Sequence, residues 1–281
     1  MVSTAPRTAR RLAHLSEALL GDASATVGPS PVAAAGPASP APPRSRAALG
    51  EEDLETYERE GVVVIRGFFS ENELAAIANP IAELQGAPES PLVTGADGTK
   101  FNYPDFQGLR QLPELATASC DHPRVVGAVE QALGDDAELS QFGALTWAPD
   151  AGGVGLHYDY KPFRVVGSFL DWMFCIIPLT EYDEHDGPLL VCPRSHCLTT
   201  VLPNDDDAAL LGANRVHQVD AAQVPPLEMV RDELIDPQLK RGDLLLMKCF
   251  TFHFADSNRS PSNGRTGLYM KFRVSPRPLD F

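Results

Sequence analysis

The chain has 281 residues, of which 43% are hydrophobic and 22% charged, a composition typical of a globular protein. No stretch approaches the roughly 18 to 20 consecutive apolar residues of a membrane-spanning helix, so we expect no membrane span. The formal net charge of −15 argues against nucleic acid as a partner, because an acidic surface repels phosphate backbones.

The first 50 residues differ from the rest of the chain. Between Gly21 and Gly50, 23 of 30 positions are Ala, Pro, Gly or Ser, and such a segment buries too little apolar surface to offset its ordering entropy. We therefore predict a disordered leader over residues 1–50 and a folded domain over residues 51–281. Because the leader holds five basic and only two acidic residues, it also resembles an organelle transit peptide.

Cysteine usage points to a reducing compartment. There are five cysteines, an odd number, with no CxxC pair and no secretory signal peptide before them. A disulfide framework is therefore not expected. These features favour a cytoplasmic protein, with a mitochondrial or plastid location as the alternative if residues 1–50 are a transit peptide.

The first half of the folded part predicts helices around one strand. Gly61 ends a predicted helix over 51–60, and the β-branched run 62–65 predicts a strand. Ser70 and Glu73 have the spacing of a capping box, which opens a helix over 71–84. Further elements are a turn-rich loop over 91–113 and an amphipathic helix over 122–133.

After Gly134, short apolar runs alternate with turns. We predict strands within the runs 139–147, 155–160, 168–179, 189–192, 243–248 and 266–274. Regularly spaced short strands late in a chain favour a β sandwich or jelly roll. Residues 198–240 are too long for a hairpin connection and suit an insert that forms a lid.

The segment around His157 and Asp159 carries the first candidate chemistry. On a strand, residues i and i+2 face the same way, so an imidazole and a carboxylate at this spacing can hold one cation between them. His253 is the best candidate for a third ligand. Two histidines and one carboxylate on one face of a metal are the ligand set of non-haem Fe(II) oxygenases.

Arg265 is the second candidate, twelve residues after His253. It opens a predicted strand, and an arginine in an otherwise apolar cavity can bind one end of a dicarboxylate bidentately. Most arginines instead form surface salt bridges, and this reading remains open at this point.

Four segments in order resemble the phytanoyl-CoA dioxygenase (PhyH-like) family of Fe(II)/2-oxoglutarate oxygenases over roughly residues 52–275. Gly61-Val-Val-Val-Ile-Arg-Gly-Phe-Phe69 resembles the family's opening strand, and His157-Tyr-Asp159 its metal-binding HxD. Asp186-Gly-Pro-Leu-Leu-Val-Cys-Pro-Arg-Ser-His196 resembles the family's NGPLxxxPGSH run. The closing segment combines Gly242-Asp243 with His253, Asn258 and Arg265.

The resemblance implies a fold, an activity and a ligand set. The fold is α+β and mainly β, a double-stranded β-helix of the jelly-roll or cupin-like type with flanking N-terminal helices. The activity is Fe(II)-dependent oxidation of a substrate by O2, with decarboxylation of 2-oxoglutarate to succinate and CO2. His157, Asp159 and His253 would hold Fe(II).

The same resemblance implies four residues for 2-oxoglutarate. Arg265 would pair with its distal carboxylate, and Trp172 stands where the family often places a tryptophan against the co-substrate. Lys100, the only lysine before His157, and Gln141, on the strand before the HxD, are further candidates. Trp172 and Gln141 are equally compatible with ordinary strand positions.

The sequence also departs from the family pattern. Arg194 stands where the family usually has glycine, and Ala255 replaces a common serine two residues after the distal histidine. The loss of that hydroxyl removes one possible hydrogen bond to 2-oxoglutarate. Asp159 is retained, which favours hydroxylation, because halogenating relatives have a small residue at that position.

The substrate class is inferred from charge. An acyl-CoA needs a basic groove for its phosphates, and this acidic chain shows no basic run, so we favour a small molecule. Alternatives are an acyl-CoA hydroxylase of the phytanoyl-CoA type and a desaturase or cyclase using the same site. Readings of a different class are a Zn or Mn hydrolase or isomerase and a non-catalytic metal-binding jelly-roll module.

Overall fold

A computed structural model describes residues 49–86, 93–94, 100–101, 112–159, 172–198, 200–202, 218–220 and 224–274. The leader predicted over residues 1–50 lies almost wholly outside this part of the chain. The same is true of residues 203–217 and 221–223 in the predicted insert, so its role as a lid stays a prediction. None of the described helices is long and apolar enough to cross a membrane.

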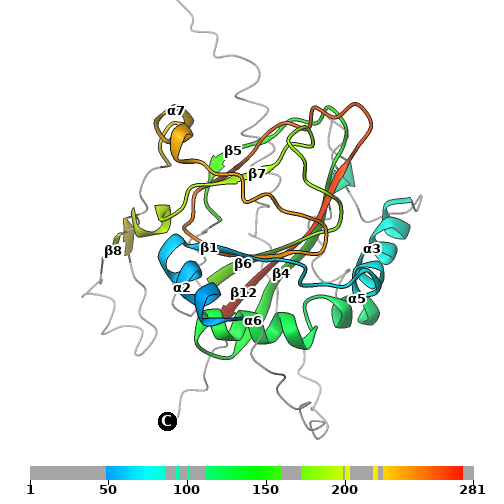
Figure 1. Cartoon of the computed structure of the whole chain (residues 1–281), viewed down its shortest axis with the longest axis horizontal. Coiled ribbons are helices and arrows are strands. Elements are labelled where there is room, and N and C mark those ends of the chain that lie inside the picture. The colour runs from blue at the N-terminus through cyan, green and yellow to red at the C-terminus, as the bar shows by residue number, and fades with distance from the viewer. Residues whose placement is uncertain are drawn as a thin grey trace, which may run out of the picture.

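Two antiparallel sheets form the centre of the molecule (Figure 1). The larger has the strand order β1-β10-β6-β12-β4-β3-β2, and the smaller has the order β5-β11-β7. The larger sheet comprises β1 (Val62–Ile65), β2 (Val93–Thr94), β3 (Lys100–Phe101), β4 (Ala137–Trp147), β6 (Trp172–Pro178), β10 (Leu244–Lys248) and β12 (Arg265–Val274). The smaller comprises β5 (Val154–His157), β7 (Leu189–Val191) and β11 (His253–Ala255), and a separate ribbon pairs β8 (Thr200–Leu202) with β9 (Gln218–Asp220). This is the double-stranded β-helix that the sequence predicted, with helices on its flank.

Helices α2 (Glu51–Glu60), α3 (Glu71–Gly86), α5 (Pro113–Ala118) and α6 (Pro123–Leu133) lie on the side of the larger sheet that faces away from the smaller one (Figure 1). Gly61 ends α2 with a φ of 77°, a left-handed conformation that glycine adopts without steric cost. The capping box before α3 is present, with Glu73 accepting from the Ser70 backbone N–H at 2.8 Å. The short helix α7 (Leu227–Val230) and the 3-10 turns η2 (Ser195–Leu198) and η3 (Arg231–Glu233) complete the described elements.

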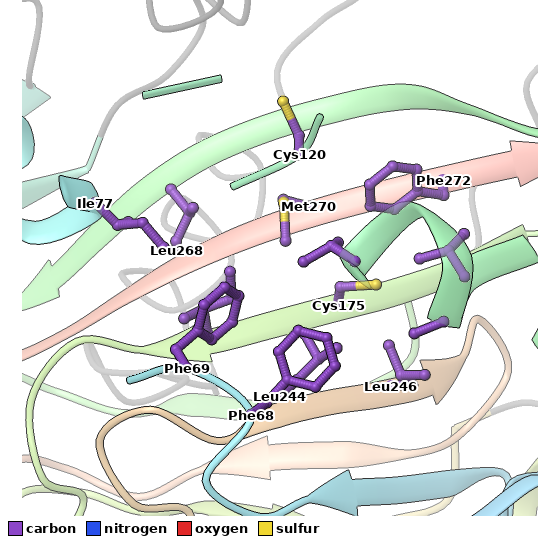
Figure 2. Packing of buried hydrophobic residues seen from close by; sticks show 14 of the residues in the cluster. Phe68, Phe69, Ile77, Cys120, Cys175, Leu244, Leu246, Leu268, Met270 and Phe272 are labelled. Carbon is purple, nitrogen blue, oxygen red and sulfur yellow. The ribbon is translucent and has the colours of Figure 1, made fainter. Parts of the chain in front are cut away.

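The main hydrophobic core fills the space between these helices and the larger sheet (Figure 2). Strand β12 shows how the sequence builds it, because its residues alternate between two faces. Leu268, Met270 and Phe272 are at most 3% exposed and pack into this core. The intervening positions, Arg265 among them, belong to the opposite face, which looks toward the smaller sheet.

A β-bulge at Ser140 changes the alternation of strand β4. Gln141 lies opposite Lys271 of β12, but the next pair is Leu139 with Phe272, so Ser140 has no partner. Leu139 packs against the helix-side core although it stands two residues from Gln141. Without the bulge both would face the same way. The bulge therefore allows Leu139 to join the core while Gln141 keeps the face that carries Lys271.

The structure corrects several sequence expectations. The segment 91–113, predicted as loop, contains β2 and β3 and the first residue of α5. The three-residue strand β11 was missed, because a run so short carries no readable alternation. Strand β5 ends at His157, so Asp159 lies beyond it and not on the strand as predicted. The described end of the 198–240 insert is joined to the sheet, since Ile235 and Val191 exchange backbone hydrogen bonds of 2.9 Å.

Candidate active site

Three side chains predicted as metal ligands meet at one end of the smaller sheet. His157, the last residue of β5, lies directly opposite His253, the first residue of β11. Asp159 follows two residues later. One ligand atom from each of the three lies within 4.8 Å of the others, and the two imidazole ring centroids are 4.1 Å apart. Residues almost 100 positions apart in sequence are thus held together by a single pair of antiparallel strands.

Both histidines are oriented with one ring nitrogen free for a metal. Nδ1 of His157 lies 2.8 Å from the Gly155 carbonyl oxygen, and Nδ1 of His253 lies 3.0 Å from that of Thr251. A carbonyl can only accept, so each Nδ1 carries the proton and each Nε2 keeps its lone pair. Burial and the neighbouring His253 lower the pKa of His157 to about 4, so this imidazole is neutral near pH 7.

Asp159 remains ionised although it is buried. Burial raises the pKa of its carboxyl, but the ammonium of Lys271, followed by His253 and His157, outweighs this and holds the pKa well below the ordinary value. Lys271 Nζ lies 2.9 Å from Oδ1, and His253 Nε2 lies 3.3 Å from Oδ2. Two imidazole nitrogens and one carboxylate form the donor set suited to a non-haem ferrous ion.

Arg265 is buried at the opposite end of β12 from Lys271 and is only 2% exposed. Its guanidinium carbon lies 5.5 Å from the ring centroid of Trp147, its partner on β4, and 5.0 Å from that of Tyr182. Its Nε and Nη1 have no hydrogen-bond partner within the described structure, and neither has the indole Nε1 of Trp147. A buried cation without a counter-ion costs several kcal/mol. A carboxylate bound here would neutralise the charge and accept from these donors, which is the fit that 2-oxoglutarate requires.

The remaining predicted co-substrate residues occupy different places. Gln141 lies opposite Lys271, next to the metal end of the sheet. Trp172 lies opposite Arg273, whose guanidinium carbon is 5.7 Å from its ring centroid. Trp172 is therefore eight positions along β12 from Arg265, roughly 26 Å at strand spacing, and the tryptophan that contacts Arg265 is Trp147. Lys100 lies in β3 opposite Thr146, and its side chain is outside the described structure.

Two residues of the closing motif act as structural ties. Asn258 donates to the Asn263 carbonyl oxygen at 2.8 Å and accepts from the Ser260 backbone N–H at 2.9 Å, which fixes the loop leading into β12. Asp243 accepts from the Gly67 backbone N–H at 2.9 Å and from Arg66 at 2.7 Å. This anchors the connection between β1 and α3.

Sequence reasoning missed Lys271 and Tyr182 as site residues. For Lys271 a signal was available, because positions 265 and 271 share one face of a strand that begins at Arg265. Tyr182 carried none, since it lies in a connection and reaches Arg265 only through the fold. Gly267 makes room for it, because a Cβ there would collide with the Tyr182 hydroxyl.

The fold and the two ends of this site define an Fe(II)- and 2-oxoglutarate-dependent dioxygenase. The family model described as "Phytanoyl-CoA dioxygenase (PhyH)" matches residues 57–267, and the chain belongs to this family. The match spans both sheets and all three predicted metal ligands.

Other known proteins are also similar to this chain. An ectoine dioxygenase of Stutzerimonas stutzeri is 25% identical over 240 residues, covering 79% of this chain and 76% of the relative. A crystal structure of EctD from S. alaskensis with 2-oxoglutarate and 5-hydroxyectoine has a TM-score of 0.60 at 19% identity and covers 83% of each chain. The non-haem α-ketoglutarate-dependent epimerase SnoN has a TM-score of 0.61 at 20% identity, with coverage of 82% of this chain and 86% of SnoN.

Proposed function

We propose that the protein hydroxylates a small organic molecule, with His157, Asp159 and His253 holding Fe(II) and Arg265 holding the distal carboxylate of 2-oxoglutarate. The observation that carries this proposal is the combination of a preformed metal triad with a buried, unpartnered guanidinium, on the face of β12 that also carries Lys271, the partner of Asp159. The iron would supply the oxygen chemistry, and succinate and CO2 would leave as the products of 2-oxoglutarate.

In this proposal the chain's own residues bind and orient the metal and 2-oxoglutarate, and they exclude water from the site. The carbonyls of Gly155 and Thr251 fix the two imidazoles, so binding of the metal needs no reorientation of the rings. Trp147 and Tyr182 enclose the guanidinium of Arg265, and in such surroundings its attraction for a carboxylate is stronger than at a solvated surface. We also propose that Gln141 forms a hydrogen bond with 2-oxoglutarate or with a water ligand of the iron, because it lies opposite Lys271 at the metal end of the larger sheet.

A small substrate fits the charges of the site face better than an acyl-CoA. On β12, Lys271 is paired with Asp159 and Arg273 with Glu138, which leaves Arg265 as the cation without a described partner on that strand. Arg265 is assigned to 2-oxoglutarate, so the described part of β12 offers no further cation for coenzyme A phosphates. Ectoine is the first compound to try, because the curated relatives carry the name ectoine dioxygenase.

We further propose a cytoplasmic location. No disulfide joins the five cysteines, all of which lie in the described part of the chain, and four of them are buried. This supports a protein that works in a reducing compartment.

The test needs no substrate. Fe(II) followed by 2-oxoglutarate is added to anaerobic metal-free protein, and the weak visible charge-transfer band of the chelate is recorded. We expect the band in the wild type, its loss in His157→Ala, and a requirement for much more 2-oxoglutarate in Arg265→Ala. His185→Ala is the matched control, because this histidine side chain is 70% exposed in a loop away from the triad.

Bound metal without a band in the wild type would contradict the dioxygenase assignment. With the band established, candidate compounds are screened by succinate release and product mass. A gain of one oxygen atom identifies hydroxylation, whereas a loss of two hydrogens or an unchanged mass identifies desaturation, ring closure or epimerisation at the same site.

A further inference from the structure

Lys271 is a buried cation in contact with the metal triad, and the dioxygenase assignment gives it no role. It lies on β12, opposite Gln141 of β4 and Phe174 of β6. Its side chain is 13% exposed, as is that of Asp159. Its ammonium also lies 5.4 Å from the ring centroid of Phe174, an aromatic contact that stabilises a buried cation.

The two oxygens of the Asp159 carboxylate have different partners. Oδ1 accepts from Lys271 Nζ at 2.9 Å, and the same ammonium lies 3.4 Å from the Asp159 backbone oxygen. Oδ2 lies 3.3 Å from His253 Nε2, the nitrogen that is free for a metal. Oδ2 is thus the carboxylate oxygen that lies nearest to His253.

Asp159 needs such support because the sheet does not hold it. Strand β5 ends at His157, so no ladder hydrogen bonds fix the backbone at residue 159. The position of Lys271, in contrast, is fixed from both sides by β4 and β6. A lysine on the most firmly paired strand of the larger sheet therefore bridges to a carboxylate just beyond the end of a strand in the smaller sheet.

We propose that Lys271 is a positioning residue that occupies Oδ1 of Asp159 and presents Oδ2 to the metal. This proposal rests on metal binding by the triad, the first part of the proposed function, and is independent of 2-oxoglutarate. Hydrogen-bond partners of metal-ligating carboxylates typically change metal affinity by about 10- to 100-fold when they are removed.

Charge repulsion alone predicts the opposite change in metal affinity, so the direction of the change tests the proposal. A lysine ammonium near the site repels a divalent cation, so its removal would tighten metal binding if charge alone mattered. Positioning predicts weaker binding instead. The direction of the change in metal affinity separates the two.

The experiment measures Co(II) and Mn(II) binding to the full-length, metal-free protein by calorimetry. For Lys271→Met we expect affinity lower by about 10- to 100-fold. Lys271→Arg keeps a charged donor within reach of Oδ1 and is expected to bind metal within a few-fold of the wild type. Lys248→Met is the matched control, since Lys248 lies on β10 of the same sheet, separated from β12 by β6, and pairs with Glu58 at 2.6 Å, so we expect unchanged metal affinity.

Unchanged or tighter binding in Lys271→Met would overturn the proposal. Equal losses in the Met and Arg variants would do so as well, since they would assign Lys271 to packing. A loss in Lys248→Met of the same size would reduce the effect to general destabilisation.

A second measurement needs no metal and covers a Lys271→Met variant that folds poorly. Unfolding of Lys271→Gln, Asp159→Asn and the double variant is compared in the metal-free protein, because each single change removes the ion pair and a real contact then gives non-additive effects. Strict additivity contradicts the contact. If the wild type binds metal but shows no band with 2-oxoglutarate, the proposed function fails while the Lys271 proposal stands or falls on affinity alone.

Discussion

The two ends of the site face of β12 handle charge in opposite ways. At the metal end, the carboxylate of Asp159 is paired with Lys271 and both imidazoles are held by backbone carbonyls. At the other end, Arg265 is more deeply buried, and two of its guanidinium nitrogens have no partner in the described structure. The carboxylate at the metal end therefore has a counter-ion before any metal binds, whereas Arg265 gains one only when an anion is bound.

This difference has an energetic meaning. The paired end keeps its charges at little net cost, because each charge has an opposite partner within hydrogen-bond distance. The unpaired end stores unfavourable desolvation energy that a carboxylate releases on binding. The unpaired charge of Arg265 thus lowers the stability of the ligand-free protein and raises its affinity for a carboxylate, whereas the paired charge of Asp159 does neither. We therefore expect substitutions at the two ends to differ in their effects on stability.

The largest effect is expected from breaking the metal end. Asp159→Asn removes the anionic ligand and leaves Lys271 buried without its counter-ion. Metal affinity should fall by more than about 100-fold, because loss of a ligand exceeds the effect of losing a ligand's hydrogen-bond partner. Calorimetric titration with Co(II) measures this. Asp256→Asn serves as control, since it too loses a pairing with a basic side chain, that of Arg259, but lies outside the triad. Near-normal binding in Asp159→Asn would remove residue 159 from the site.

Arg265→Met breaks the other end, and its two effects have opposite signs. The affinity for 2-oxoglutarate should fall by roughly 30- to 150-fold, because a charge-assisted bidentate pair contributes about 2 to 3 kcal/mol. The ligand-free protein should unfold at the same or a higher temperature, since a buried unpaired charge is replaced by an apolar group of similar length. Titration of the charge-transfer band and thermal unfolding without ligand measure the two quantities.

Arg273→Met is the matched control for that variant, on the same face of the same strand. Arg273 is paired with Glu138, so its loss should lower stability slightly and leave 2-oxoglutarate affinity intact. If Arg265→Met lowered the unfolding temperature in the absence of ligand, Arg265 would have a partner in solution, and the contrast between the two ends would not hold.

A smaller effect is expected from Gly267→Ala, which alters the surroundings of Arg265 without changing its charge. The added Cβ collides with the Tyr182 hydroxyl, so Tyr182 must move from its place over the guanidinium. We expect about tenfold weaker 2-oxoglutarate binding, the size of a lost cation–π and packing contribution in a buried site. Metal affinity should stay unchanged, because Gly267 is remote from the triad. A parallel loss of metal affinity would indicate a general disturbance of β12.

How much the sequence predicts differs between the same two ends. His157, Asp159 and Arg265 are recognisable from spacing and from the resemblance, because their types and order are specific. The contacts of Arg265 are not, since Trp147 meets it through strand register and Tyr182 through a connection. Trp172, predicted beside the co-substrate, instead lies opposite Arg273, and a register of this kind cannot be read from local patterns.

The bulge at Ser140 gives the physical reason for a related limit. Sequence alternation places residues 139 and 141 on one face, yet Leu139 joins the helix-side core and Gln141 lies with Lys271. Only the pairing with β12 reveals the extra residue. Residue type and order are therefore enough to nominate candidates for this site, whereas the face that a strand residue occupies can be assigned only from the fold.

A last prediction concerns the acid stability of the metal end. The pKa of His157 is about 4 in the folded protein, below its ordinary value of 6.5, so between these pH values the unfolded chain binds one more proton. This contribution to stability is complete above about pH 6.5 and is lost as the pH falls toward 4. The slope of stability against pH is at most about 1.4 kcal/mol per pH unit.

Denaturant unfolding of the metal-free protein between pH 7 and pH 4, wild type against His157→Gln, isolates this contribution, because the variant lacks the titrating imidazole. Since protonation of His157 also opposes the metal, bound Co(II) should steepen the fall. Curves of equal slope for the two proteins would show that burial does not hold the imidazole neutral, and His157 would then not be ready to bind a metal in the metal-free protein.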